Sequence, residues 1–343
     1  MTKIYPHVKL AAMEKELKIG VLGDGGWGTT LAILLHKKGY DVTVWGAFPE
    51  YVKFLDLKRE NKKFLPGIRI PASIKFTSDI IEAAEDKDVI VLAALSQYMR
   101  PVLGKLKKAG GAPIYVSVAK GIENRSLLRV SQVIEEKLGK VNLAILSGPT
   151  ISYEVARGMP TTAVAASAKK NVARKAQEIF GTEYFRVYTS RDVVGVELGG
   201  SLKNIIAIAA GMSDGLGFGT NSKSALLARG LVEITRLGAA MGAQEDTFFG
   251  ISGLGDLVTT CINPHGRNRW FGEQIGRGKT PKEILKGTEM VVEGIATAKS
   301  AYDLSKKYKV DMPITEQIYN ILYRNKSPKI AVRELMLRPM KSE

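Results

Sequence analysis

The stretch Lys18-Ile19-Gly20-Val21-Leu22-Gly23-Asp24-Gly25-Gly26-Trp27-Gly28 decides the fold, because an apolar run leads directly into a Gly-x-Gly-x-x-Gly turn. A helical pattern over residues 27–38 follows it. In such a unit the first glycine permits the tight turn, the second lets the backbone approach a pyrophosphate, and the third allows close helix–strand packing. The free N–H groups of the helix then face the phosphates. Gly23, Gly25 and Gly28 therefore predict a dinucleotide site, whereas a glycine-rich turn without a ligand is the weaker alternative.

Short apolar runs alternate with helical patterns on either side of this unit. The predicted strands are residues 18–22, 42–45, 89–94, 113–118, 143–146, 162–166 and 185–188. Helical patterns separate most of them, at residues 27–38, 98–108, 127–138 and 170–180. This alternation predicts βαβ units and a mostly parallel sheet that helices cover on both faces.

The strand signal fades after about residue 191. Helical patterns follow at residues 193–210, 222–241, 293–307, 315–323 and 330–337, with connectors expected at 211–221 and 263–269. The sequence thus predicts an α/β fold, in which a Rossmann-like domain at residues 17–190 precedes an all-helical domain at residues 191–343. A ligand is expected between the two domains. Residues 1–16 hold charges of both signs and no apolar segment, so they are expected to be a flexible lead-in, with either Met1 or Met13 as the start.

Composition excludes several classes of protein. The chain has 343 residues, of which 45% are hydrophobic and 24% charged, which is ordinary for a globular protein and argues against disorder. Cys261 is the sole cysteine, so a disulfide scaffold is excluded, and with three histidines no metal site is expected. No uncharged apolar run approaches about 18 residues, so no membrane insertion is expected and the cytoplasm is the default location.

The net charge of +16 has three interpretations: a nucleic acid, an anionic membrane surface, or acidic small ligands. The basic residues occur in short pairs such as Lys37-Lys38 and Lys62-Lys63, and no run of five or six is present. No nucleic-acid partner is therefore expected. A basic nucleic-acid binder, or a regulatory protein that keeps the fold without catalysis, stays as the alternative of a different class.

The choice between NAD and NADP is left open by the second predicted strand. An acidic residue at its end would hold the ribose 2′-hydroxyl, whereas an arginine would hold a 2′-phosphate. The sequence there is Val44-Trp45-Gly46-Ala47-Phe48-Pro49-Glu50, with neither group at the strand end. Glu50 and Lys53 come a few residues late, so the cofactor is NAD or NADP.

Several polar residues of the second half lie within apolar or glycine-rich stretches. Lys203 and Asn204 interrupt an otherwise apolar helix, which is costly in a buried place unless they are used; the alternative is a lysine that extends to the surface. Asp256 follows a glycine-lined turn that begins at Ser252. In Gly266-Arg267-Asn268 the arginine and asparagine are suited to bind a phosphate.

Taken together, these motifs resemble those of the bacterial NAD(P)-dependent glycerol-3-phosphate dehydrogenases, from about residue 18 to residue 335. Seven motifs occur in the family's order: Gly23–Thr30, Lys120-Gly121, Ser147-Gly148-Pro149-Thr150, Glu197–Asn204, Gly253–Thr260, Gly266–Arg269 and Val291-Val292-Glu293-Gly294. One departure is Ala94-Leu95-Ser96-Gln97, where many relatives have Val-Pro-Ser, so the shape of this loop is open.

The resemblance implies roles for the matching residues. Lys203 would be the proton donor and acceptor, with Lys120 and Asp256 as its catalytic neighbours. The substrate would be bound by Lys120, Gly148, Thr150, Asn204, Thr260, Gly266, Arg267 and Asn268. The cofactor would contact Gly26, Trp27, Lys120, Ser152, Arg267, Val291 and Glu293 in addition to the three motif glycines.

The implied reaction is the interconversion of dihydroxyacetone phosphate and sn-glycerol 3-phosphate with NAD(P)H, which would supply glycerol 3-phosphate for phospholipid synthesis. The small-molecule substrate is the expected partner, and a homodimer is implied. Crowding by Lys120 is expected to lower the pKa of Lys203 towards the working pH. Another dehydrogenase of this architecture is the alternative enzyme, but those enzymes separate the lysine and asparagine by three residues, whereas Lys203 and Asn204 adjoin.

Overall fold

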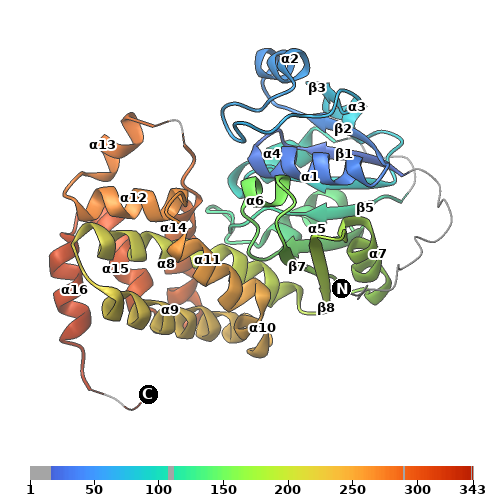
Figure 1. Ribbon diagram of the computed structural model, residues 1–343. Coiled ribbons are helices and arrows are strands. Elements are labelled where there is room, and N and C mark those ends of the chain that lie inside the picture. The colour runs from blue at the N-terminus through green and yellow to red at the C-terminus, as the bar shows by residue number, and fades with distance from the viewer. Residues whose placement is uncertain (1–16, 107–111, 289, 341, 343) are drawn as a thin grey trace, which may run out of the picture.

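The computed structural model describes residues 17–106, 112–288, 290–340 and 342, and it has two regions of different architecture (Figure 1). Strands and helices alternate up to Ser190, and helices alone follow from Val193 among the described residues. The predicted lead-in, residues 1–16, lies outside the described residues. The predicted combination of a Rossmann-like domain and a helical domain is confirmed.

Within the described residues one eight-stranded sheet has the order β3-β2-β1-β4-β5-β6-β7-β8. Its described strand pairs are parallel except β6 with β7. The mostly parallel sheet is therefore confirmed. The strands are β1 Lys18–Leu22, β2 Asp41–Trp45, β3 Lys75–Thr77, β4 Val89–Leu92, β5 Ile114–Ser117, β6 Asn142–Ser147, β7 Thr161–Ala166 and β8 Phe185–Ser190.

Helices cover both faces of this sheet. Val89 and Val91 of β4 belong to one apolar core, whereas Ile90 and Leu92 belong to another. This alternation follows from the two-residue period of a strand, since successive side chains point to opposite faces. The helices of this region are α1 Gly26–Lys37, α2 Pro49–Lys58, α3 Ile80–Ala84, α4 Met99–Gly104, α5 Val130–Leu138, α6 Ser152–Ala156 and α7 Lys170–Phe180.

The second region is built around α8, Val193–Gly215, which is buried at every position from Gly195 to Ser213. By length and composition α8 could cross a membrane, but 89% of its most apolar stretch is buried inside the protein, as expected of a core helix. The other described helices are α9 Thr220–Ala240, α10 Asp246–Phe249, the π-helical turn η2 Ile251–Gly255, α11 Asp256–Ile262, α12 Arg267–Gly276, α13 Pro281–Lys286, α14 Glu293–Tyr308, α15 Pro313–Arg324 and α16 Pro328–Met336.

The two predicted connectors, residues 211–221 and 263–269, are shorter than expected, because neighbouring helices extend into both. α8 continues to Gly215, and α12 begins at Arg267. Glycine has low helix propensity, but tertiary packing overrides it here. A β-carbon on Gly211 of α8 would lie 1.8 Å from the Arg269 carbonyl oxygen of α12, so the missing side chain is what lets these helices pack together.

Candidate active site

The glycine-rich turn has the geometry that its sequence demands. Gly23 has φ +136°, and its N–H donates to the Trp45 carbonyl at 3.0 Å, which fixes the turn against the end of β2. A β-carbon on Gly28 would lie 2.0 Å from the Gly23 oxygen, whereas one on Gly25 would meet nothing within 4 Å. The turn lies at the carboxyl end of β1, where the strand order reverses towards β4. Its closed inner side and open outer side fit a bound pyrophosphate.

The neighbouring residues of the predicted cofactor site lie close to this turn. A β-carbon on Gly26 would lie 2.6 Å from the Phe64 carbonyl oxygen. Trp27 is partly buried, with its ring centroid 6.4 Å from that of Phe185. The Ser152 carbonyl accepts a hydrogen bond from the Thr30 hydroxyl at 3.1 Å, which brings the start of α6 to α1.

The three residues predicted to be catalytic meet at one carboxylate. Lys203 Nζ of α8 donates to Asp256 Oδ1 at 2.6 Å, and Lys120 Nζ, from the loop after β5, donates to Asp256 Oδ2 at 2.7 Å. Lys203 also donates to the Thr260 hydroxyl, which itself donates to the Asp256 carbonyl at 2.7 Å. One negative charge is thus shared by two lysines from opposite regions of the chain.

Two residues after β6 complete the surroundings of Lys120. The Gly148 carbonyl accepts hydrogen bonds from Lys120 Nζ at 2.9 Å and from the Thr150 hydroxyl at 3.1 Å. Gly148 has φ +144°, a region that favours glycine, and this conformation belongs to the turn that presents the carbonyl to the lysine. The predicted substrate-site residues Gly148 and Thr150 therefore stand beside the lysine pair.

Lys203 is buried, with only 6% of its surface exposed, so the alternative in which it extends to solvent is wrong. Burial is the main cause that lowers the pKa of Lys203 to about 8, because the charged form loses hydration. Asp256 opposes this shift, and Lys120 adds to it by a smaller amount. The crowding expected from Lys120 is present, but it is secondary to burial.

Small residues explain how α8 reaches this position. A β-carbon on Gly200 would lie 2.5 Å from Ser147 Oγ, and one on Gly199 would lie 2.6 Å from the Ser252 carbonyl oxygen. The Glu197 carboxylate, one turn earlier, accepts from the Ser131 N–H at 2.7 Å and ties α8 to α5. The motif from Glu197 to Asn204 therefore places the lysine as well as supplying it.

The predicted phosphate-binding residues separate into buried and exposed groups. Asn268 donates to Asn204 Oδ1 at 3.0 Å and accepts from the Gly294 N–H at 2.9 Å, so its amide links α8, α12 and α14. The Arg267 side chain is 47% exposed, with Nη2 3.9 Å from Glu293 Oε2. Its Nη1 donates to the Val291 carbonyl at 3.0 Å.

Two further features complete this part of the site. Gly266 precedes α12 and donates its N–H to the Asn263 carbonyl at 3.1 Å, so it shapes the start of that helix. Burial raises the pKa of the Glu293 carboxyl, while the charges of Arg267 and Lys120 oppose that shift. Arg267 and Glu293 thus lie in the electrostatic surroundings of the lysine pair.

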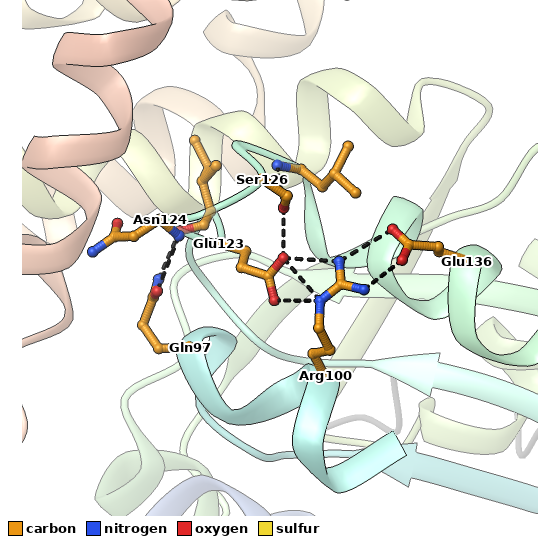
Figure 2. Close-up of polar contacts among 8 residues, drawn as sticks. Gln97, Arg100, Glu123, Asn124, Ser126 and Glu136 are labelled. Carbon is orange, nitrogen blue, oxygen red and sulfur yellow. Dashed lines mark hydrogen bonds and ion pairs between the residues drawn. The ribbon is translucent and has the colours of Figure 1, made fainter. Parts of the chain in front are cut away.

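The loop after β4 has a defined shape without the proline of many relatives. Ser96–Tyr98 forms a 3-10 turn, and the Gln97 amide donates to the Ile122 carbonyl at 2.6 Å and accepts from the Asn124 N–H at 3.1 Å (Figure 2). Arg100 adds a 2.8 Å ion pair with Glu123. The loop is therefore fastened to the segment that follows Lys120, a role for Gln97 that the sequence did not predict.

Comparisons with known proteins agree with this geometry. Residues 18–173 match the model of the NAD-dependent glycerol-3-phosphate dehydrogenase N-terminus, and residues 192–333 match that of the C-terminus. The chain belongs to the NAD-dependent glycerol-3-phosphate dehydrogenase family. It is therefore an oxidoreductase of this family, whose reaction interconverts dihydroxyacetone phosphate and glycerol 3-phosphate with NAD(P)H. The predicted activity is confirmed, and the alternative dehydrogenases of the same architecture are set aside.

Relatives of this dehydrogenase family match nearly the whole chain. The glycerol-3-phosphate dehydrogenase, NAD(P)+, of Citrifermentans bemidjiense is 52% identical over 330 residues, which are 95% of this chain and 98% of that protein. That of Fusobacterium nucleatum is 48% identical over 330 residues, with the same two coverages. The crystal structure of the Coxiella burnetii enzyme has a TM-score of 0.91 at 34% identity, covering 94% of this chain and 99% of that one. The predicted cofactor, NAD or NADP, is thereby confirmed.

Proposed function

We propose that Lys203 exchanges the proton of the reaction, and that Lys120 and Asp256 hold it in position. The observation that carries this proposal is the shared Asp256 carboxylate, which accepts Lys203 on one oxygen at 2.6 Å and Lys120 on the other at 2.7 Å. NADH or NADPH supplies the hydride when bound. The Lys203 ammonium then gives a proton to the oxygen on C2 of dihydroxyacetone phosphate, and in the reverse direction the neutral amine takes it back.

Arg267 is the proposed binding residue for the substrate phosphate. Its guanidinium is half exposed at the start of α12, which leaves donors available to an anion, and a planar fork suits a phosphate. Binding the phosphate away from the reacting carbon would turn remote binding energy into orientation. Gly148, Thr150, Asn204, Thr260, Gly266 and Asn268 are the remaining proposed substrate-site residues.

The proposed cofactor site extends from the glycine-rich turn to the lysine pair. Gly23, Gly25, Gly26, Trp27 and Gly28 would face the pyrophosphate, and Ser152 borders them through its bond to Thr30. Lys120, Arg267, Val291 and Glu293 would lie towards the nicotinamide end. The open space outside Gly25 supports the phosphate end of this assignment.

The test of the proton-transfer role is Lys203→Met, a variant in which Asp256 keeps Lys120 as its partner. Turnover with dihydroxyacetone phosphate is expected to fall by about 10²–10⁴-fold, while the dissociation constant for NADH stays within a few-fold. Lys306→Met is the matched control, because its ammonium pairs with Glu316 at 3.0 Å on the surface. Near-normal turnover of the Lys203 variant would remove the assignment.

The phosphate role of Arg267 has a separate test. Arg267→Ala is expected to raise the KM for dihydroxyacetone phosphate with a smaller effect on kcat, because the guanidinium does not touch the reacting carbon. The comparison substrate is dihydroxyacetone, which has no phosphate and should be insensitive to the change. An unchanged KM for the phosphorylated substrate would show that another group binds the phosphate.

We also propose the cellular setting and assembly that the family resemblance implies. The protein would act in the cytoplasm as a homodimer and supply glycerol 3-phosphate for phospholipid synthesis. Exposed apolar side chains on and after α16 support an interface there: Ile330, Met336, Leu337 and Met340. The proposed domains are residues 17–190 for dinucleotide binding and 191–343 for substrate binding and catalysis. Sedimentation equilibrium would test the dimer, and a monomer at micromolar concentration would contradict it.

A further inference from the structure

Asp24 carries a partly buried carboxylate that the catalytic arrangement does not use. Its Oδ2 atom is shielded from solvent and has no hydrogen-bond partner among the described residues. Burial raises the pKa of this carboxyl for the same reason, since the charged form has lost its hydration. A buried carboxylate oxygen without a partner is costly, so its retention in the glycine-rich turn needs an explanation. Asp24 as a whole is only partly buried, so a ligand can approach the residue from its exposed side.

The position of Asp24 identifies which part of a dinucleotide it would meet. The Gly23 N–H donates to the Trp45 carbonyl, and the Gly46 N–H donates to the Thr77 carbonyl, both at 3.0 Å. The turn is thereby held against the last residue of β2. A β-carbon on Gly46 would lie 2.4 Å from Asp24 Oδ2, so the carboxylate occupies the space above the first residue after β2.

That space is where dinucleotide-binding folds place an acidic side chain for the adenosine ribose, about 20 residues after the glycine-rich turn. This chain has Gly46 and Ala47 there, with no side chain able to do this. The two observations are complementary, because Gly46 leaves the room that Asp24 fills. A carboxylate for the ribose would then come from the turn after β1 instead of from the end of β2.

The backbone of Asp24 is fixed by its neighbours. Asn61, which is fully buried, donates from Nδ2 to the Asp24 carbonyl at 2.8 Å and to the Thr29 hydroxyl at 2.8 Å. The Tyr51 hydroxyl donates to the other end of that amide, Asn61 Oδ1, at 2.7 Å. The carboxylate is therefore presented by a rigid turn, which lowers the entropic cost of binding.

We propose that Asp24 makes this enzyme prefer NAD(H) to NADP(H), by accepting a hydrogen bond from the 2′-hydroxyl of the adenosine ribose and repelling a 2′-phosphate at the same place. This inference rests on the proposed dinucleotide site. The competing acid, Glu50, is exposed and forms a 3.4 Å pair with Lys53, so its charge is already matched at the surface.

The experiment measures binding without catalysis, by titration calorimetry with ADP-ribose and with its 2′-phosphorylated form. The wild-type protein is expected to bind ADP-ribose at least about tenfold more tightly than its 2′-phosphorylated form. A factor of this size corresponds to the loss of one hydrogen bond to a charged group. Asp24→Asn keeps the shape and removes the charge, so the affinity ratio should shrink by about tenfold or more. Glu50→Gln removes a charge from the same neighbourhood and should leave the ratio unchanged.

Three outcomes decide the matter, with Asp24→Ala as a second variant and circular dichroism as the check of folding. A ratio that shrinks in both Asp24 variants and not in the Glu50 variant supports the inference. A preference of the wild-type protein for the phosphorylated ligand, or an unchanged ratio in the folded Asp24 variants, overturns it and leaves the dinucleotide site intact. Failure of both ligands to bind the wild-type protein overturns the dinucleotide site as well.

Discussion

Lys203 is charged although it is buried, and its hydrogen-bond partners explain how the charge is stabilised there. Asp256 supplies the opposite charge, and the Thr260 hydroxyl accepts a further hydrogen bond. The cost of burial is thus reduced without being abolished, which is why the pKa of Lys203 lies at about 8. A lysine with this pKa holds its proton at neutral pH and releases it in mildly alkaline solution, as a proton donor that must also act in reverse requires.

The pKa of Lys203 predicts opposite pH dependences for the two directions of the reaction. Reduction of dihydroxyacetone phosphate needs the ammonium, so its kcat should fall as the pH rises through about 8. Oxidation of glycerol 3-phosphate needs the neutral amine, so its kcat should rise over the same interval. Initial rates from pH 6 to pH 10 in both directions measure this dependence. Initial rates are needed because the reaction itself consumes or releases a proton, so its equilibrium also shifts with pH.

The Lys203→Met variant supplies the control for the pH experiment. Its residual rate should lose the step near pH 8 in both directions, because the variant lacks the amine whose pKa lies at about 8. Identical profiles in wild type and variant would mean that the step belongs to substrate or cofactor ionisation. The assignment of the step to Lys203 would then be wrong.

At the scale of single residues, the sequence predicted which residues take part in the chemistry better than it predicted which residues contact one another. Lys120, Lys203 and Asp256 were expected together, yet the resemblance could not say that one carboxylate takes both lysines. Residues 120 and 256 are 136 positions apart, and such a pairing is set by the packing of the two regions. The Asp24 carboxylate was missed for a similar reason, because its signal is the close approach of Asp24 Oδ2 to Gly46, which no linear pattern records.

At the scale of elements, the pair α8 and α12 shows glycine used for close packing. A β-carbon on Gly272 would lie 2.0 Å from the Ile208 carbonyl oxygen, and one on Gly276 would lie 2.4 Å from the Met212 oxygen. Both glycines belong to α12, whose first residues were predicted from the sequence to be part of a connector. The backbones therefore approach directly, and the residues at the start of α12 are held beside Asn204.

Gly272→Ala is expected to destabilise the protein despite the better helix propensity of alanine. Propensity alone would stabilise α12 by about 1 kcal/mol. The overlap with the Ile208 carbonyl involves backbone that cannot rotate away, and such overpacking costs about 1–3 kcal/mol, so a net loss is expected. Urea unfolding measures the free energy, and the KM for dihydroxyacetone phosphate should rise as Arg267 moves with α12.

The matched control for this substitution is Gly104→Ala, at the end of α4. A β-carbon on Gly104 would meet nothing within 4 Å, so the change should be neutral or slightly stabilising. If both alanine variants were equally stable, the contact between α8 and α12 would be looser than the structure indicates.

Helices and strands with a strong periodic pattern in the sequence were predicted, and those with a weak pattern were missed. The apolar strands β1, β4 and β5 and the long helix α8 were expected from periodicity. Strand β3 was missed because it has three residues, Lys75–Thr77, too few to show alternation. The π-helical turn η2 before Asp256 was expected only as a tight turn, since its helical form depends on packing against α8.

At the scale of the whole molecule, the +16 charge exceeds what the site uses. Lys120, Lys203 and Arg267 account for three of the positive charges near the proposed anionic ligands. The remaining excess is spread over exposed positions such as Lys140, Lys170 and Lys282, and a diffuse positive field attracts anions over a distance set by salt. Both proposed ligands are phosphorylated, so the field should speed their encounter with the protein.

The value of kcat/KM for dihydroxyacetone phosphate should therefore fall as the salt concentration rises, while kcat changes little. The Debye length shortens from about 30 Å at 0.01 M to about 8 Å at 0.15 M, so attraction from distant lysines is lost first. Chloride competing at the phosphate site would give a similar fall, and a triple variant with Lys140, Lys170 and Lys282 replaced by glutamine separates the two causes. Steering by the diffuse charge requires a weaker salt dependence in the triple variant, because its field is smaller. An undiminished dependence would assign the effect to anion competition at the site and leave the surface charge without a part in catalysis.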